Sequence, residues 1–305
     1  MTYRFAVAVP ARNEAACLPA CLKALARAAD HANADLDVVV LANNCEDDTA
    51  SVGRLALGRR LSVEVVETQL PAERAHAGWA RRLALDAASA RLRRGGDLLL
   101  STDADTLVAE DWLTRTLTHI ASGYDAVAGM ARLHSRDLRA LPRPHRARLA
   151  NLRRYDLAIS YLKAARDADE PWPRHYYEGG ASMAMTRAVY ARTGGAPTPR
   201  VGEDKALFDA VRAVGGRVRH AVDVRVVTSG RLVGRAPGGA SDTLSLWGRL
   251  GEDDPIAGVQ TIAKSLDLSG ADPTALTFRH LPAEIEKARA LVRLARRTPE
   301  LAAVG

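Results

Sequence analysis

Apolar and polar positions along the first third of the chain alternate in a way that is typical of strands followed by helices. Short apolar runs predict buried strands, and apolar residues three or four positions apart predict helices. The predicted strands are Arg4–Pro10, Leu36–Ala42, Leu61–Val66 and Asp97–Ser101. The predicted helices between them are Glu14–Ala32, Asp48–Leu57 and Arg74–Arg93. Such alternation forms right-handed βαβ units, so we expect an α/β fold with a mainly parallel sheet flanked by helices.

The pattern becomes less regular after the fourth predicted strand, although it still yields elements of both kinds. The expected elements are a strand over Tyr124–Leu133, a helix over Pro144–Arg166, a short helix from Arg187, a helix over Gly202–Gly215 and one or two strands within Arg217–Thr228. Beyond them, Arg231–Ser241 is rich in glycine and arginine, and the remainder is expected to be helical or loosely packed. We therefore expect one α/β domain over residues 1–230 and a C-terminal helical and loop appendage over 231–305.

Polar residues follow the ends of three predicted strands. The clusters are Pro10–Glu14, Asn43–Thr49 and Ser101–Thr106, and the last of these contains Asp103 and Asp105. Ligands of parallel sheets bind beyond the carboxyl ends of the strands. Each cluster alone could be turn or capping chemistry, but three on one edge favour a site. Two carboxylates one residue apart can share a divalent cation with a phosphorylated ligand.

The basic charge is concentrated in one segment. The chain has 43 basic and 36 acidic residues, a formal charge of +7. Residues 131–166 hold ten basic side chains against Asp137 and Asp156, a local charge of +8, so the rest sums to about −1. A nucleic-acid binder would also present aromatic side chains beside the basic ones, and this window has only Tyr155 and Tyr161. We therefore expect no nucleic-acid partner.

The apolar run Phe5–Ala11 is far too short to span a membrane, and it lacks the flanks of a signal peptide. A cytoplasmic location is therefore expected. The helix from Pro144 could lie on an anionic membrane surface. Its apolar stripe is also what a helix packed on a core needs, and this second explanation is favoured.

Four segments, in this order, resemble family 2 glycosyltransferases of the GT-A fold. They are Val9–Glu14, the loop Asn43–Thr49, Thr102–Thr106 and Gly202–Lys205. The resemblance covers roughly residues 4–230 and implies a GT-A (Rossmann-like) domain, with a donor half over about 1–106 and an acceptor half over about 107–230. It implies transfer of a sugar from a nucleotide diphosphate donor to an acceptor hydroxyl, with Mg²⁺ or Mn²⁺ as cofactor.

The resemblance also assigns the donor side of the site. Asp105 is the expected direct metal ligand, and Asp103 reaches the ribose or the metal. The other donor-binding candidates are Pro10, Ala11, Arg12, Glu14, Asn43 and Arg81. Arg81 falls where related sequences carry a basic residue near the donor, and the alternative is a surface arginine. Asn43 replaces an aspartate that usually meets uracil; its amide suits the N–H and carbonyl edge of uracil, guanine or thymine, so UDP is favoured but not fixed.

The metal site departs from the family pattern. The family often supplies a histidine ligand near the end of the last strand, and this chain has Thr228 there, with His220 displaced from the position. A metal site with fewer protein ligands follows. His220 is expected to be a structural or surface residue.

The pair Glu203-Asp204 at a predicted helix start is the candidate acid–base element. A carboxylate there is stabilised by the helix N-terminus, so simple capping is the alternative. In the functional interpretation, Asp204 removes the proton of the acceptor hydroxyl, which attacks opposite the diphosphate and inverts the sugar carbon. Glu203 positions the acceptor or shares the role.

Two glycine-rich segments complete the predicted site. Glu178, Gly179 and Gly180 are expected to bind the acceptor or donor sugar, because glycine allows close backbone approach; a plain turn is the alternative. Arg231 and Arg235 lie in a segment that suits a lid over the diphosphate, or a linker.

Two other functions remain open from the sequence. A nucleotidyltransferase of similar fold would need a glycine-rich phosphate loop after the first strand, and Ala11–Glu14 is not one. A basic adaptor would use residues 131–166 to bind an anionic partner without catalysis. If the chain is an enzyme, the same basic helix could face an acceptor that carries phosphate or carboxylate.

Overall fold

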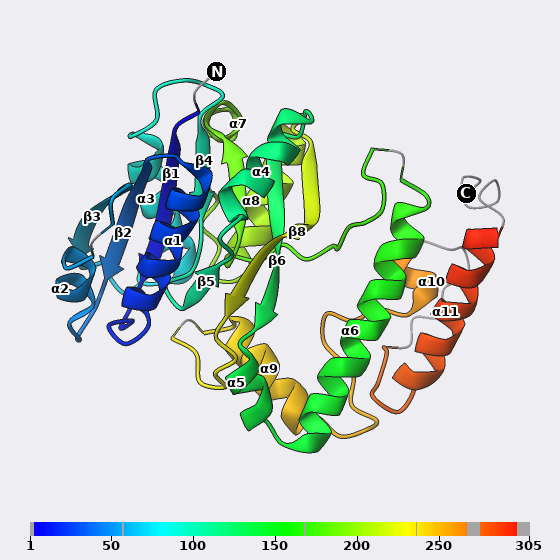
Figure 1. Cartoon of the computed structure of the whole chain (residues 1–305). Coiled ribbons are helices and arrows are strands. Elements are labelled where there is room, and N and C mark those ends of the chain that lie inside the picture. Colours follow the sequence, from blue (N-terminus) through cyan, green and yellow to red (C-terminus); the bar gives the residue numbers. More distant parts are fainter. Residues whose placement is uncertain (1–2, 57, 168, 236, 267–274, 298–305) are drawn as a thin grey trace. The chain divides into compact units, whose positions relative to one another are not determined.

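The computed structural model describes residues 3–56, 58–167, 169–235, 237–266 and 275–297 (Figure 1). The chain divides into two units, each with its own internal packing. The first unit contains Met1–His134, Tyr177–Ser229 and Gly234–Gly239. The second contains Ser135–Tyr176, Gly230–Val233 and Ala240–Gly305.

Eight strands of the described chain form one sheet in the first unit, in the order β3-β2-β1-β4-β7-β6-β8-β5. Their bounds are β1 Phe5–Ala11, β2 Leu36–Asn43, β3 Leu61–Thr68, β4 Leu98–Ser101, β5 Thr106–Val108, β6 Ala126–Leu133, β7 Met183–Thr186 and β8 Val218–Thr228. Strands β3, β2, β1 and β4 are parallel neighbours, as are β6 and β8. The pairs β4–β7, β7–β6 and β8–β5 are antiparallel. The predicted α/β fold with a mainly parallel sheet is confirmed.

Helices cover both faces of this sheet. Their bounds are α1 Leu18–Ala32, α2 Thr49–Arg54, α3 Ala77–Ser89, α4 Trp112–Ala121, α7 Arg187–Arg192 and α8 Glu203–Ala213. Alternate residues of β1 point to opposite faces: Val7 packs in a core with α1 and α4, and Ala8 packs in a second core with α3, α7 and α8. Burial on both faces explains why the central strands are continuous apolar runs.

The ends of several elements differ from the predictions. Helix α1 begins at Leu18, not Glu14, because the backbone N–H of Glu14 donates to Thr49 Oγ1 at 2.7 Å and the residue belongs to a loop. Helix α2 ends at Arg54, and Leu57, its predicted end, lies outside the described residues. Strand β5 was not expected, since three residues are too few for a periodic signal.

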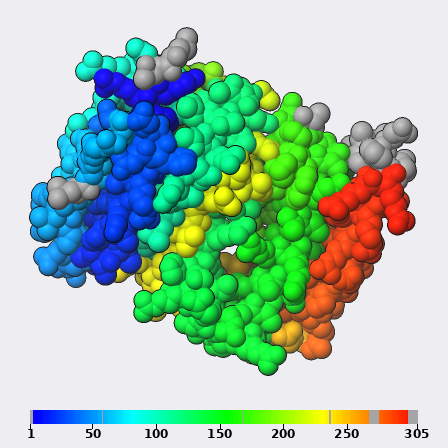
Figure 2. Space-filling view, in the orientation of Figure 1, coloured from blue at the N-terminus to red at the C-terminus, as the bar shows by residue number. Residues whose placement is uncertain are grey.

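The second unit is helical. Its helices are α5 Ser135–Ala140, α6 Arg143–Ala164, α9 Ala240–Arg249, α10 Ile262–Ser265 and α11 Leu281–Arg297. Helices α6 and α11 lie side by side (Figures 1 and 2), and their core includes Tyr155, Ile159 and Ile285. Residues 135–176 thus pack with the C-terminal helices, while the predicted domain division near residue 230 stays a prediction. Residues 267–274 and 298–305 of the predicted appendage lie outside the described residues.

Part of the basic segment serves the packing of the second unit. Arg148 Nη1 donates to the carbonyl oxygens of Trp247 and Leu250 at 3.1 and 2.7 Å, and Arg166 Nη1 donates to Leu266 O at 2.9 Å. Arg143, Arg153 and Arg154 are exposed on α6. Over the described part of the chain, we find no helix with the length and apolar character to cross a membrane.

Candidate active site

The predicted polar clusters do meet at one edge of the sheet. Strands β2, β1 and β4 are adjacent and parallel, so the loops after them leave the same edge. The backbone N–H of Thr102 continues the ladder to Ala8 O at 3.2 Å, which places the aspartate loop directly beside the end of β1. The structure therefore brings Glu14, Asn43 and Asp103 to the carboxyl ends of three neighbouring strands.

Asp103 and Asp105 occupy the loop between β4 and β5, and both are half-buried. Asp103 Oδ1 accepts from Arg81 Nη2 at 2.8 Å. Asp105 Oδ1 lies 3.5 Å from the hydroxyl of Thr228, which in turn accepts from Thr106 Oγ1 at 2.9 Å. Thr228 therefore does stand beside Asp105, at the end of the strand from which the family's histidine ligand is expected.

The rest of the described chain adds little to a metal site. No group of three or more His, Cys, Asp or Glu side chains within those residues is arranged to hold a metal ion. Asp103 and Asp105 supply hard carboxylate oxygens only. Such a donor set fits Mg²⁺ or Mn²⁺, which keep several water ligands and share substrate phosphates.

Arg81 is buried in α3, with its side chain 6% exposed, so the surface-arginine alternative is wrong. Its guanidinium donates to Asp103 Oδ1, to Glu203 Oε1 at 3.2 Å, to Ser101 Oγ at 3.0 Å and to Gly180 O at 3.3 Å. Burial alone would lower the pKa of Arg81, but the carboxylates of Asp103 and Glu203 outweigh it and raise that pKa. Arg81 is thus a fixed cation at the junction of the aspartate loop and α8.

Glu203 and Asp204 begin α8, as predicted, directly after Gly202, whose φ of 76° is left-handed. Asp204 Oδ2 accepts from the backbone N–H of Gly180 at 3.0 Å, and Oδ1 accepts from the N–H of Lys205 at 2.8 Å. Burial raises the pKa of Asp204, the nearby Glu203 carboxylate raises it further, and Arg81 partly opposes both. A carboxylate with a raised pKa at a site edge is suited to accept a proton.

The Glu178–Gly180 segment meets the same junction. A Cβ on Gly180 would lie 2.6 Å from the Cζ of Arg81, so the residue must be glycine for the backbone to approach this guanidinium. The backbone of Gly180 therefore approaches Arg81 closely, while the predicted approach of this segment to a sugar or acceptor stays a prediction. At Gly179, no heavy atom of the described residues other than the glycine itself and its two chain neighbours lies within 4 Å of the corresponding Cβ position.

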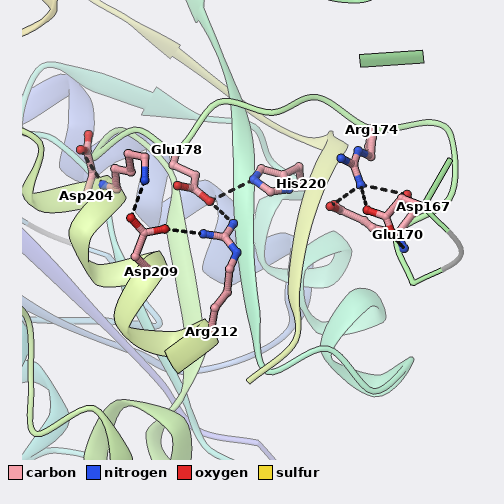
Figure 3. Close-up of polar contacts among 9 residues, drawn as sticks. Asp167, Glu170, Arg174, Glu178, Asp204, Asp209, Arg212 and His220 are labelled. Atoms are coloured by element: carbon pink, nitrogen blue, oxygen red, sulfur yellow. Dashed lines mark hydrogen bonds and ion pairs between the residues drawn. The ribbon is translucent and has the colours of Figure 1, made fainter. Parts of the chain in front are cut away.

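Glu178 is held by two basic side chains of the first unit (Figure 3). Its Oε1 accepts from Arg212 Nη2 of α8 and lies 3.1 Å from His220 Nε2 of β8. Burial would raise the pKa of Glu178, but these two partners overcome it and lower the pKa. His220 is 7% exposed, which agrees with the structural role expected for it. Arg212 was missed, because no local signal distinguishes it from a surface arginine of an amphipathic helix.

The donor-side loops are tied to one another. Pro10 and Ala11 end β1, Asn43 ends β2 with 4% exposure, and Arg12 is half-buried. Asp47 joins the two loops, because its carboxylate accepts from the N–H groups of Ala15 and Thr49 at 3.0 and 3.1 Å. The Thr49 hydroxyl also donates to Asp47 Oδ1, and this bond together with the two N–H bonds overcomes the effect of burial and lowers the pKa of Asp47.

A shallow hollow of about 190 Å³ opens beside Asn43, at the ends of β2 and β3. Its lining residues are Ala42, Cys45, Glu67, Thr68 and Gln69. Cys45 belongs to the predicted Asn43–Thr49 loop, but the other four were not expected from the sequence, because nothing in their local pattern marks them as more than strand-end residues.

The two arginines of the predicted lid differ in what the structure shows. Arg235 Nη1 lies 2.8 Å from Glu14 Oε1, and the Glu14 side chain is only 7% exposed. Arg231 is half-buried and belongs to the second unit. Ala236, inside the predicted lid, lies outside the described residues. Whether this segment closes over a donor stays a prediction.

Residues 3–234 match the sequence model of the family described as glycosyltransferase like family 2. The chain belongs to this family. It is therefore a transferase enzyme, which argues against the alternative of a non-enzymatic basic adaptor. Among curated proteins, none matches the chain.

Solved structures agree on the fold. A mannosyltransferase from Pyrobaculum calidifontis, in complex with GDP-Man and Mn²⁺, is similar with a TM-score of 0.54 and 22% identity, over 99% of this chain and 73% of that one. S. aureus TarS, residues 1–349, is similar with a TM-score of 0.50 and 16% identity, over 94% of this chain and 71% of that one. These likenesses show the GT-A type of fold for the glycosyltransferase.

Proposed function

We propose that this glycosyltransferase moves a sugar from a nucleotide diphosphate donor to an acceptor hydroxyl with inversion at the sugar carbon. The observation that carries the proposal is the buried Arg81, which joins Asp103 of the donor loop to Glu203 at the start of α8. One guanidinium thereby fixes the geometry between the donor carboxylates and the candidate base, Asp204. Catalysis by positioned groups depends on such fixed geometry.

Asp204 is proposed as the general base. It would accept the proton of the acceptor hydroxyl while the oxygen attacks the sugar carbon opposite the leaving diphosphate, which inverts that carbon. The N–H of Gly180 orients the carboxylate through Oδ2. Glu203, whose side chain is 11% exposed and paired with Arg81, supports this geometry and is proposed to position the acceptor.

Asp103 and Asp105 would hold Mg²⁺ or Mn²⁺ together with the donor phosphates. When bound, the ion supplies positive charge to the diphosphate as the glycosidic bond breaks. Asp105 is proposed as the direct ligand, since one Asp103 oxygen is already engaged by Arg81. The mannosyltransferase with the similar fold was solved with Mn²⁺, which supports this choice of ion.

The donor nucleotide is proposed to lie over the ends of β1 and β2. Pro10, Ala11, Arg12, Glu14 and Asn43 would surround its base and ribose. We propose UDP as the first candidate and GDP as the second, because the Asn43 amide suits both bases. When the donor binds, Arg235 would leave Glu14 and pair with the diphosphate instead. Arg231 is a second candidate to neutralise the negative charge of the diphosphate.

The acceptor is proposed to carry phosphate or carboxylate. This proposal rests on the exposed arginines of α6, Arg143, Arg153 and Arg154. Replacing the three by glutamine should raise the KM for an anionic acceptor while leaving the KM for the donor unchanged. An unchanged acceptor KM would remove the support for an anionic acceptor.

The test of the proposed function is a screen of nucleotides and nucleotide sugars with Mn²⁺. A nucleotide that binds the folded state should raise the melting temperature, and the matching sugar donor should then release free nucleoside diphosphate. A parallel assay supplies a nucleoside triphosphate with a sugar phosphate. Pyrophosphate release there, without nucleoside diphosphate release from the sugar donor, would identify a nucleotidyltransferase and overturn the proposal.

A further inference from the structure

Glu178 is a buried glutamate near the candidate base Asp204, and it has no part in the proposed donor or metal sites. Glu178 lies in the loop that leads through Gly180 to β7. Its side chain is 8% exposed, and its Oε1 meets both Arg212 and His220 (Figure 3). A carboxylate so enclosed by two basic groups offers little surface to a substrate.

The three partners come from three different elements. Glu178 is in the loop before β7, Arg212 is in the last turn of α8, and His220 is on β8. Arg212 also donates from Nη1 to Asp209 Oδ1 at 3.0 Å (Figure 3), and Asp209 pairs with Lys205. The loop is therefore fastened both to the sheet and to helix α8, which carries Asp204 in its first turn.

Two residues after Glu178, the same loop contacts the base itself. The N–H of Gly180 donates to Asp204 Oδ2 at 3.0 Å, while Gly180 O accepts from Arg81. The charged groups that act on Asp204 are Glu203, Arg81 and Asp103. The Gly180 N–H also contacts Asp204, and its position depends on the loop that Glu178 anchors.

We propose that Glu178 is a positioning residue: held by Arg212 and His220, it fixes the loop that aims the Gly180 N–H at Asp204. The proposal rests on the proposed role of Asp204 as general base. It replaces direct acceptor binding by Glu178, because the carboxylate is turned into the protein. Loss of the N–H donor would disfavour the ionised carboxylate and so raise the pKa of the base.

The test compares Glu178→Gln with Glu170→Gln. Glu170 is a matched control, since its side chain is 9% exposed and pairs with Arg174 at 2.9 Å in the second unit (Figure 3). Glu178→Gln should lower kcat by roughly 10- to 100-fold, as misplacement of a catalytic group does. The acid limb of its kcat–pH profile should move to higher pH, and the donor KM should stay unchanged. Glu170→Gln should leave the acid limb in place.

A pair of variants at Arg212 distinguishes loss of positioning from misfolding. Arg212→Lys keeps the charge and should retain more activity than Arg212→Gln. It should also move the acid limb of the kcat–pH profile less than Arg212→Gln does. A rise in acceptor KM, with the kcat–pH profile unmoved, would overturn the proposal and return Glu178 to acceptor binding. Unchanged kinetics in Glu178→Gln would overturn it as well.

Hydrogen exchange separates this proposal from the proposed function. The Gly180 amide should be protected in the wild type and exchange faster in Glu178→Gln, while the Glu170→Gln variant keeps the protection. This measurement by NMR needs no substrate, so it holds even if the wild type transfers no sugar. Equal protection of Gly180 in all three proteins would overturn the proposal on its own.

Discussion

Arg81 Nη2 lies 2.8 Å from Asp103 Oδ1, and this ion pair is formed by the most buried cation of the candidate site. The same guanidinium reaches Glu203 at 3.2 Å. The positive charge of Arg81 offsets the electrostatic repulsion between the acidic side chains of the site. Asp103, Glu203 and Asp204 can then remain close together before any cation or donor arrives.

Replacing Arg81 should therefore damage both stability and activity. Arg81→Gln leaves Glu203 buried without its partner, and breaking a buried pair costs about 3 to 5 kcal/mol. Urea unfolding measures this loss, and kcat should fall with it. Arg82→Gln is the neighbouring control: Arg82 is 30% exposed and pairs with Asp86, so a loss of about 1 kcal/mol or less is expected. Equal losses at the two positions would contradict the central role of Arg81.

A methyl group at Gly180 should disturb the junction, whereas one at Gly179 should not. The Cβ of Gly180→Ala would overlap the guanidinium of Arg81, which four protein contacts hold in place. Gly179→Ala meets open space. We expect Gly180→Ala to lower the melting temperature and reduce kcat by roughly 100-fold, as misplacement near a base can do. Similar melting temperatures and kcat values for both variants would show that the Arg81 side chain moves aside to accommodate the methyl group.

Metal affinity should respond to Thr228. Its hydroxyl lies 3.5 Å from Asp105 Oδ1, so Thr228→His would add an imidazole beside the two carboxylates. Imidazole is a good ligand for divalent transition metals, and we expect Mn²⁺ without donor to bind roughly 10-fold more tightly. Electron paramagnetic resonance of free Mn²⁺ measures this.

The control for that change is Thr228→Val, which removes the same hydroxyl contact and adds no ligand. It should leave Mn²⁺ affinity unchanged. Asp105→Asn should weaken Mn²⁺ binding more than Asp103→Asn, because Asp103 is shared with Arg81. The reverse order would assign direct ligation to Asp103. Chelation of the metal with EDTA should abolish most transfer activity in the wild type.

Asp204→Asn should abolish transfer while changing how stability depends on pH. The folded-state pKa of Asp204 is raised, so its favourable contribution is present below the unfolded-state pKa and is lost as the pH rises through the folded-state value. The melting temperature of the wild type relative to Asp204→Asn should therefore increase on acidification. A relative stability that decreases on acidification would contradict the raised pKa, and full activity in the variant would exclude Asp204 as the base.

The alternation of short apolar runs with helices was enough to place Glu14, Asn43 and Asp103 at one sheet edge, because the carboxyl ends of parallel strands must meet there. Arg81 could not be placed in the same way. Its partner Glu203 is 122 residues away, and the contact depends on α3 and α8 covering the same face of the sheet. Strand β7, antiparallel between β4 and β6, creates that arrangement and has no periodic signal of its own.

The role of Glu178 was hidden for a similar reason. Glycines after an acidic residue do indicate close backbone approach, and Gly180 has one, but sequence does not say which group is approached. Arg212 and His220 lie on α8 and β8, more than 30 residues further along the chain. Only the packing of these two elements shows that Glu178 is enclosed.

Asp156 of α6 provides a test of stability away from the site. The hydroxyl of Tyr176 donates to its carboxylate, yet burial outweighs this bond and raises the pKa of Asp156 from 3.8 to about 6. A raised folded-state pKa means that the contribution of Asp156 to stability is lost as the pH rises through about 6. At neutral pH and above, the ionised carboxylate costs up to about 3 kcal/mol.

Asp156→Asn should therefore unfold at higher urea than the wild type at about pH 8, and the difference should shrink towards about pH 4.5, where the wild-type carboxyl is protonated when folded. Asp167→Asn in the same unit is the control of opposite sign. Arg174 overcomes the effect of burial and lowers the pKa of Asp167, so this variant should be less stable than the wild type at high pH and approach it on acidification. Parallel shifts in the two variants would show that burial does not govern Asp156, since the opposite signs follow only from their different surroundings.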